Sequence, residues 1–115
     1  MDKLEIKNAR IESTMLGIED HGSMTFFLYL DYGGSGQGMG GYVLDGGHKP
    51  SGHAFGAIRK ILETLEVDTW EKLPKQLCRV EADDGKVYRI GHTIKNRWFD
   101  LAAYMKEASP EFPGI

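Results

Sequence analysis

The residues best suited to bind a ligand lie in the stretch DYGGSGQGMGGY, residues 31–42. This stretch holds six of the 15 glycines in the chain and has a tyrosine near each end. Three structures would use such a composition: a phosphate-binding loop, a flexible linker, and a β-hairpin whose backbone lies close to another group. Each of them requires different flanking sequence.

A phosphate-binding loop is disfavoured by the residues after the glycines. Gly36, Gly38 and Gly41 match the pattern GxGxxG. A dinucleotide site needs a strand before this pattern and a helix directly after it, so that the helix N-terminus meets the pyrophosphate. Here residues 42–45 (YVLD) are typical of a strand, and the chain has no GK[ST] sequence. We therefore expect neither a dinucleotide-binding loop nor a P-loop.

The spacing of the glycines instead favours a hairpin. Gly36, Gly38 and Gly40 alternate with other residues, and a period of two places them on one face of a strand. Each glycine in a strand destabilises it by about 0.5–1 kcal/mol relative to alanine. A face without side chains usually marks a place where another group approaches the backbone. That group is an aromatic side chain of this chain such as Trp98 or Phe99, a ligand, or another protein.

The hairpin and its tyrosines form the candidate binding site. Consecutive backbone N–H groups over residues 33–38 can donate to phosphate or ribose oxygens, and Tyr32 or Tyr42 can stack on a base. The candidate ligand- or partner-binding residues are Tyr32, Gly33, Gly34, Ser35, Gly36, Gln37, Gly38, Gly40 and Tyr42.

Residues for catalysis or metal binding are not grouped in the sequence. The histidines do not have the spacing of metal ligands, and no nucleophile motif is present. The single cysteine, Cys78, allows no intrachain disulfide and is expected to be a buried strand residue. We therefore predict a protein that is not an enzyme and that binds no metal and no cofactor.

Hydrophobic patterning predicts the elements that position the hairpin. A main amphipathic helix begins near His53 after an N-cap at Ser51. Its apolar stripe holds Phe55, Ile58, Leu62 and Leu65, widened by Ala54, Ala57 and Ile61. A last helix begins after Asp100. The predicted strands cover residues 4–18 with a bulge near Lys7–Asn8, residues 24–32, 42–45, 76–82 and 86–92.

These elements define the class α+β in the order β-β-β-α-β-β-α. Short connections favour antiparallel pairing, so we predict a twisted antiparallel sheet of about five strands with the main helix packed on one face. The length of 115 residues corresponds to a single domain, assigned to residues 1–107. Prolines make residues 108–115 an irregular tail.

Composition limits the partners. The net charge of −3 disfavours duplex nucleic acid, because phosphate binding depends on clustered lysine and arginine. No apolar run approaches the ~18 residues of a membrane span, and the first residues lack the apolar region of a signal peptide. The expected compartment is therefore the cytoplasm, with no membrane contact.

Four segments resemble a family of small proteins encoded by tailed phages and prophages. They are IESTMLGIEDHG (11–22), LDYGGSGQGMGGYVLD (30–45), WEKL (70–73) and IGHTIKNRWFD (90–100). The resemblance extends to about residue 100, and its most specific part is the glycine stretch. Where the family more often has an aromatic residue, this chain has Met39. The resemblance implies a phage setting and no particular chemistry. By analogy with other small, acidic phage proteins that lack catalytic motifs, we expect a non-enzymatic binding protein that inhibits antiviral defence in the cytoplasm of an infected bacterial host.

Two hypotheses for that inhibition remain open. In the first, the glycine-rich hairpin sequesters a nucleotide-derived signal made by the defence system. In the second, the chain binds a host defence protein directly, such as a CRISPR effector or a nuclease, with the hairpin as an edge for strand addition. A homodimer formed across the same edge is compatible with both hypotheses.

Overall fold

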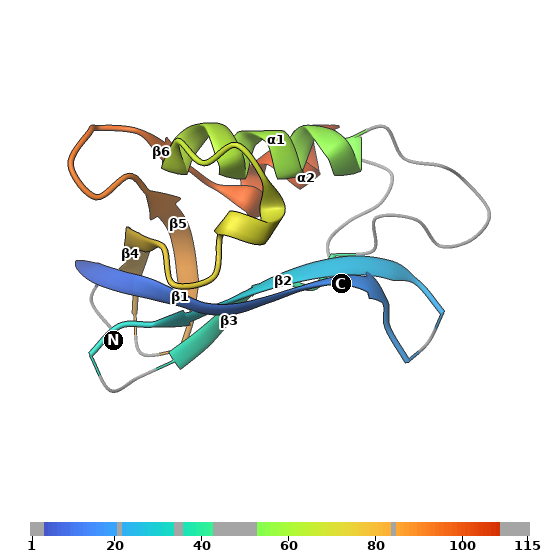
Figure 1. Ribbon diagram of the computed structural model, residues 1–115, viewed down its shortest axis with the longest axis horizontal. Helices are drawn as coiled ribbons and strands as arrows, with labels where there is room; N and C mark the ends of the chain where they lie inside the picture. The colour runs from blue at the N-terminus through green and yellow to red at the C-terminus, as the bar shows by residue number, and fades with distance from the viewer. Residues whose placement is uncertain (1–3, 21, 34–35, 43–52, 84, 109–115) are drawn as a thin grey trace.

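The structure of the chain, a computed structural model, describes residues 4–20, 22–33, 36–42, 53–83 and 85–108 (Figure 1). Gly34 and Ser35, most of the predicted strand 42–45, and the tail from residue 109 lie outside the described residues. The side chains of His53, Ala54 and Ala108 are also outside this description.

The described residues form a six-stranded antiparallel sheet and two helices, as the sequence predicts for the class α+β. The sheet order is β3-β2-β1-β4-β5-β6. The strands are β1 (Glu5–Ile18), β2 (Met24–Asp31), β3 (Gly36–Gly40), β4 (Leu77–Ala82), β5 (Val87–Gly91) and β6 (Trp98–Phe99). The helices are α1 (His53–Leu65) and α2 (Leu101–Ala108), with a 3-10 turn at Trp70–Lys72. The short strand β6 was not predicted, because two residues carry no periodic signal.

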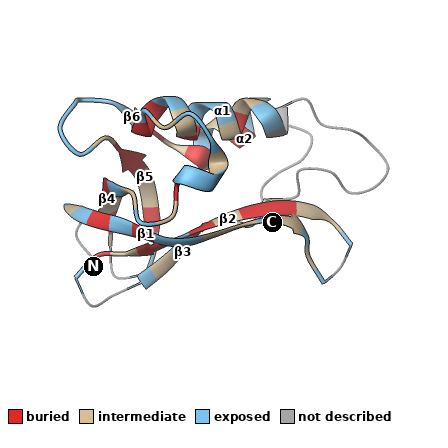
Figure 2. Cartoon of the chain, viewed as in Figure 1, coloured by how far each residue is buried: buried red, intermediate tan, exposed pale blue. Residues whose placement is uncertain are grey.

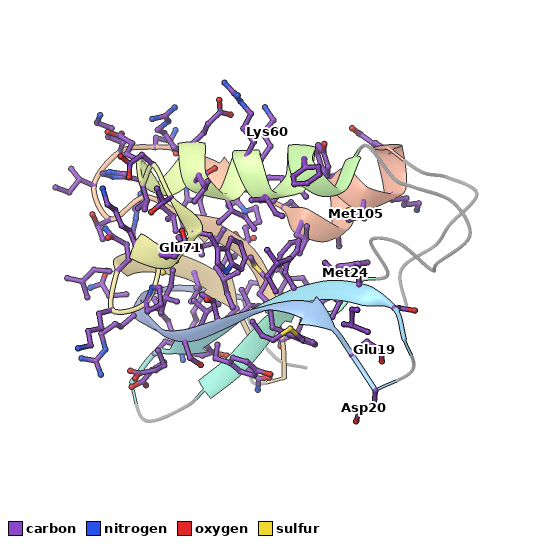
Figure 3. The ribbon with its side chains drawn as sticks, turned by 45° about the vertical axis from the view of Figure 1, so that its right-hand side comes forward. Glu19, Asp20, Met24, Lys60, Glu71 and Met105 are labelled. Atoms are coloured by element: carbon purple, nitrogen blue, oxygen red, sulfur yellow. The ribbon has the colours of Figure 1, made fainter. Side chains whose placement is uncertain are left out.

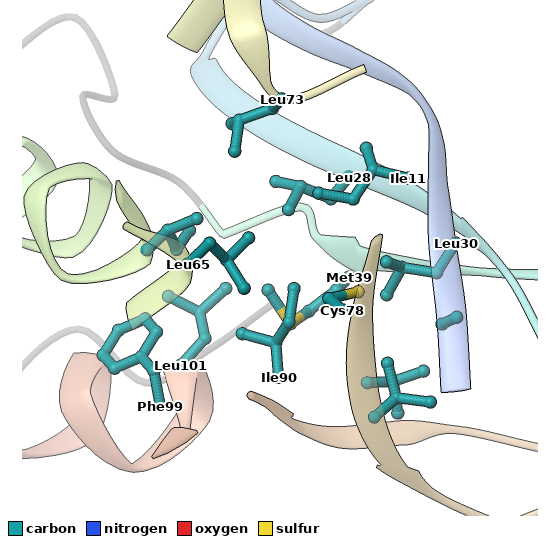
Figure 4. Close-up of a cluster of buried hydrophobic side chains, with 14 of the residues drawn as sticks. Ile11, Leu28, Leu30, Met39, Leu65, Leu73, Cys78, Ile90, Phe99 and Leu101 are labelled. Atoms are coloured by element: carbon teal, nitrogen blue, oxygen red, sulfur yellow. The ribbon is translucent and has the colours of Figure 1, made fainter. Parts of the chain in front are cut away.

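Both helices lie on the same face of the sheet, and no helix of the described residues covers the opposite face (Figure 1). The core fills the space between these layers, and buried residues are concentrated where strands face helices (Figure 2). In Figure 4, side chains from β1, β2 and β3 meet Cys78 of β4, Ile90 of β5 and Leu101 of α2. The core is therefore built from segments that lie far apart in the sequence.

The strand β2 sets the two faces of the sheet. Its side chains alternate, so that Phe26, Leu28 and Leu30 are buried against the helices. Phe27 and Tyr29 point to the opposite face, where Tyr29 is 45% exposed. Because β2 pairs with both β1 and β3, this alternation also determines which residues of its neighbours face the core.

The bulge in β1 lies at Glu12 and not near Lys7–Asn8, where the sequence suggested it. The register with β2 shifts between Ile11 and Ser13. A bulged residue lets two successive side chains share a face. Here Glu12 and Ser13 are both exposed, and the Glu12 carboxylate forms an ion pair with Arg10, with 2.6 Å between Oε1 and Nη2. Hydrophobic alternation first weakens near Lys7–Asn8, but this weakening does not mark the bulge.

Helix α1 begins at His53 as predicted, and most of its predicted apolar stripe faces the core. Ala57, Ile61 and Leu65 are buried. Phe55, the first large residue of the predicted stripe, is instead 80% exposed, so hydrophobicity alone overstated its role. Lys60 points away from the sheet (Figure 3).

Helix α2 begins after Asp100, as the sequence predicts. The Asp100 carboxylate accepts a hydrogen bond of 2.9 Å from the backbone N–H of Ala103, which is a typical N-cap. Gly56 of α1 faces the hydroxyl group of Tyr104 on α2, and a Cβ at this glycine would overlap that hydroxyl. The close approach of the two helices therefore depends on glycine at position 56.

We expect Gly56→Ala to lower the free energy of unfolding by about 1–2 kcal/mol, because overpacking outweighs the gain in helix propensity. Urea denaturation measures this change. In a Tyr104→Phe background, which lacks the hydroxyl, the same substitution should be neutral or stabilising. A higher stability of Gly56→Ala in the wild-type background would contradict the close contact.

Cys78 is fully buried, and desolvation raises the pKa of its thiol to about 12. Since the thiolate is the reactive form, we expect an aromatic disulfide reagent at about pH 8 to react at least a hundredfold more slowly with the native protein than with the protein in guanidinium. Release of the reagent's chromophore measures both rates. Stoichiometric modification of the native protein within minutes would show that Cys78 is accessible.

Candidate functional site

The glycine-rich segment forms β3, an edge strand of the sheet. Gly36 and Gly38 lie on the exposed face, and Met39, next to them in the strand, is buried in the core. The predicted alternation is therefore confirmed, as is the hairpin, because β3 pairs antiparallel with β2. The turn begins at Gly33, whose φ of +78° is a conformation that glycine adopts without strain.

The ladder between β2 and β3 fixes the direction of each backbone group. The Gly41 N–H donates to the Phe26 carbonyl over 2.9 Å, which makes these two residues a hydrogen-bonded pair. Hydrogen-bonded and non-hydrogen-bonded pairs alternate along an antiparallel ladder. Met39 and Gln37 therefore direct their backbone groups towards β2. The N–H and C=O groups of Gly36, Gly38 and Gly40 point to the other side, the edge of the sheet.

An aromatic ring of the neighbouring strand covers part of the glycine face. A Cβ at Gly38 would lie 3.4 Å from the ring of Phe27, and a Cβ at Gly41 would lie 2.7 Å from it. The Phe27 ring is itself stacked on Tyr29, with 5.7 Å between centroids. Aromatic rings commonly cover glycines on an adjacent strand. Trp98 and Phe99, suggested by the sequence, do not have this role, since Trp98 covers Gly91 and Phe99 is in the core.

Beside this covered part lies an open groove of about 550 Å³ on the outer face of the sheet. It is lined by Glu12, Tyr29, Leu30, Asp31, Gly36, Gln37 and Gly38. Two of these side chains are carboxylates. The hydrogen bond to Glu12 raises the pKa of Arg10, so this guanidinium is engaged with a carboxylate of the same protein. The groove is therefore poorly suited to a phosphate.

The two candidate tyrosines do not flank the glycine face together. Tyr32 is only 5% exposed and points to the core side of the sheet, where the Lys7 ammonium lies 5.6 Å from its ring centroid. It cannot stack on a base in the groove. Tyr42 is half-buried, and desolvation, followed by the charge of Asp100, raises the pKa of its hydroxyl. Gly34 and Ser35, also candidates, lie outside the described residues.

A second cavity, of about 270 Å³, lies between β3, β5 and α2. Residues from separate segments line it: Gly38, Met39, Gly40, Tyr42, Lys86, Val87, Tyr88, Asp100, Leu101, Ala102, Ala103 and Lys106. Its β5 and α2 residues could not be found from the sequence, because no local pattern relates residues 86–88 to residues 100–106. The only signal was the position of Tyr42, which ends the glycine segment.

At the other end of the sheet, Trp98 is a structural residue. Its indole ring lies over Gly91, with the guanidinium carbons of Arg79 and Arg89 at 4.9 and 4.7 Å from the ring centroid. Arg89 also forms a bidentate ion pair with Glu81, in which Nε and Nη2 of the guanidinium each lie 3.0 Å from a carboxylate oxygen. This ion pair lowers the pKa of Glu81. These contacts fix the β5–β6 connection.

Carboxylates with lowered pKa values lie in surface contacts rather than in the cavities. A hydrogen bond from Lys95 lowers the pKa of Glu66, and a bond from Lys72 lowers that of Asp68. Within the described residues no three His, Cys, Asp or Glu side chains are grouped as metal ligands. Among those same residues, neither cavity is lined by a histidine or a cysteine.

Comparison with protein-family models, with curated proteins and with solved structures finds no match to this chain. The geometry of the site itself therefore carries the functional interpretation. Neither helix of the described chain is long and apolar enough to cross a membrane.

The contact between Phe27 and the end of β3 can be tested with two glycine substitutions. Gly41 has a φ of +85° and meets the Phe27 ring, so we expect Gly41→Ala to lower the free energy of unfolding by about 2 kcal/mol. Gly36→Ala is the matched control, since its Cβ meets only the Leu30 carbonyl at 3.4 Å. We expect it to change stability by less than about 0.5 kcal/mol. Equal effects in urea denaturation would contradict this account.

Proposed function

We propose that the chain is a non-enzymatic, phage-type inhibitor of host antiviral defence that binds a host defence protein along the edge of β3. The observation that carries this proposal is the direction of the backbone groups of Gly36 and Gly38, which point away from β2 and belong to residues without side chains. An extended segment of a partner can pair with such an edge through main-chain hydrogen bonds.

The composition of this edge supports binding. Proteins commonly protect an edge strand with lysine, proline or a covering element, because its unpaired groups attract other chains. In β3 the residues whose backbone N–H and C=O groups point to the edge are glycines. Each glycine weakens the strand by about 0.5–1 kcal/mol. Gly40 has no room for a side chain, because its φ is +130° and a Cβ would overlap the Phe26 carbonyl oxygen, and a Cβ at Gly38 would meet the Phe27 ring at 3.4 Å. A Cβ at Gly36 would meet only the Leu30 carbonyl, so the absence of a side chain there is consistent with close approach by another backbone.

A protein partner agrees better with the geometry than a nucleotide-derived signal. Glu12 and Asp31 line the groove beside the glycines and would repel phosphate groups. Tyr32, one of the two aromatic residues suggested for base stacking, is buried on the core side. Only Tyr29 offers an exposed ring there, and its neighbour Phe27 is already stacked on it.

The biological setting of the proposal comes from the sequence. The four segments that resemble phage and prophage proteins support a role during infection, and therefore in the cytoplasm of the bacterial host. The described residues offer a binding surface along β3, which is consistent with inhibition by binding. Duplex nucleic acid is disfavoured by the net charge of −3.

Substitution of Gly38 tests the edge directly. Gly38→Pro removes the N–H that points to the edge, while pairing with β2 uses the backbone groups of Gln37 and Met39. Proline is tolerated on edge strands in this orientation. In affinity capture from a bacterial host lysate, we expect the wild-type chain to retain a stoichiometric protein partner and Gly38→Pro to lose it.

Gly38→Ala is the matched control, because it changes the same residue but keeps the N–H. It should retain the partner, with both variants folded by circular dichroism. Equal capture by Gly38→Pro would exclude strand addition. Calorimetric heat on titration with cyclic dinucleotides or ADP-ribose would overturn the protein-partner version and favour signal sequestration. Light scattering that shows a dimer lost in Gly38→Pro would instead assign the edge to a second copy of the chain.

A further inference from the structure

We infer that the cavity between β3, β5 and α2 is an anchor pocket for one bulky apolar side chain of the added strand, in a partner segment that also carries an acidic residue. This inference rests on the proposed strand addition and specifies the partner's chemistry. It concerns the cavity of about 270 Å³ described above.

The cavity is continuous with the edge that the partner strand would follow. Gly38 lines both the outer groove and this cavity, and Gly40 also lines the cavity. The backbone groups of both glycines point towards the edge. β5 approaches β3 beside the cavity, so a segment that pairs with Gly36 and Gly38 would end at the mouth of the cavity, where its last side chains can enter.

The alternation of a strand determines which partner side chains enter. Successive side chains of the added strand point to opposite faces of the extended sheet. Those on the same side as Met39 face the cavity, and those on the other side lie along the groove beside Tyr29. One side chain in every two is thus directed towards the space between the sheet and α2.

The size and chemistry of the cavity fit a single apolar side chain. Its volume is below the roughly 300–1,000 Å³ of pockets that take small-molecule ligands. Met39, Val87 and Leu101 are buried residues that form its apolar wall. Apolar anchors placed in such pockets usually supply most of the binding energy of an interface.

Charge at the cavity selects the neighbouring residue of the partner. Lys86 and Lys106 line it and are both exposed, so they can approach an incoming carboxylate. The one carboxylate of the lining, Asp100, is engaged as the N-cap of α2 through the Ala103 N–H. The net charge of the cavity lining is therefore positive. An acidic residue two positions from the anchor would lie on the same side of the added strand as the anchor and would face the lysines.

Defined peptides test this inference. The probe is a blocked, fluorescein-labelled heptapeptide of threonines with leucine at its third position and glutamate at its fifth. We expect saturable binding below about 1 mM by fluorescence anisotropy, with NMR shifts at the amides of Gly36 and Gly38. Alanine in place of the leucine should weaken binding about tenfold, because the apolar anchor is lost.

Variants of the protein separate the cavity from the edge. Ala102→Trp, which fills the cavity, should reduce the affinity of the leucine peptide to that of the alanine peptide, whereas Ala102→Ser should not. A peptide with lysine in place of glutamate should bind several-fold more weakly, and Lys106→Glu should restore its binding. Circular dichroism and urea denaturation confirm that each variant is folded.

The outcomes distinguish this inference from the proposed function. Binding that is lost in Gly38→Pro but unchanged by Ala102→Trp and by the leucine-to-alanine peptide would overturn the anchor pocket and leave strand addition intact. Binding that Gly38→Pro does not weaken would overturn strand addition itself. If no peptide binds at about 1 mM, the anchor pocket is excluded, and capture from lysate decides the function alone.

Discussion

The alternation of β2 is the constraint on which the rest of the structure depends. Burial of Phe26, Leu28 and Leu30 against the helices determines the face to which every other residue of this strand points. Through the ladder, it also fixes β3, where Met39 must enter the core opposite Leu28 and the glycines must lie outside. A shift by one residue would exchange these faces, bury the glycine face of β3 and expose Met39. The position of the candidate site is thus a consequence of core packing.

The fold was predictable because its signals are local. The alternation in residues 24–32, the helical periodicity of α1 and the cap at Asp100 each lie within one short segment, and each element is found where the sequence predicts it. The misplaced bulge and the exposed Phe55 have a different origin. Both depend on which neighbour packs against the residue, and neither neighbour is adjacent in sequence. The strand β6 was missed because two residues are too few for any periodicity.

The candidate site was predictable only in part for the same reason. The glycine spacing predicted the bare face of β3 and left open whether this face was covered by the chain or lay outside. It did not predict that Phe27 would cover Gly38 and Gly41, or that Tyr32 would point to the core while Tyr42 lies at another cavity. Tyr32 follows the end of β2 and keeps the parity of its buried residues, whereas Tyr42 lies beyond Gly40 and Gly41, whose positive φ values turn the chain. The resemblance to phage proteins could supply a setting but no side-chain geometry.

The glycines of β3 also bear on self-association. Amyloid-like stacking requires side chains that interdigitate between sheets, and segments that form it contain few glycines. An edge that offers hydrogen bonds from glycines provides no such side chains, so repeated addition of identical strands gains little energy after the first pair. The glycine pattern that weakens β3 therefore also disfavours fibre growth from this edge of the sheet.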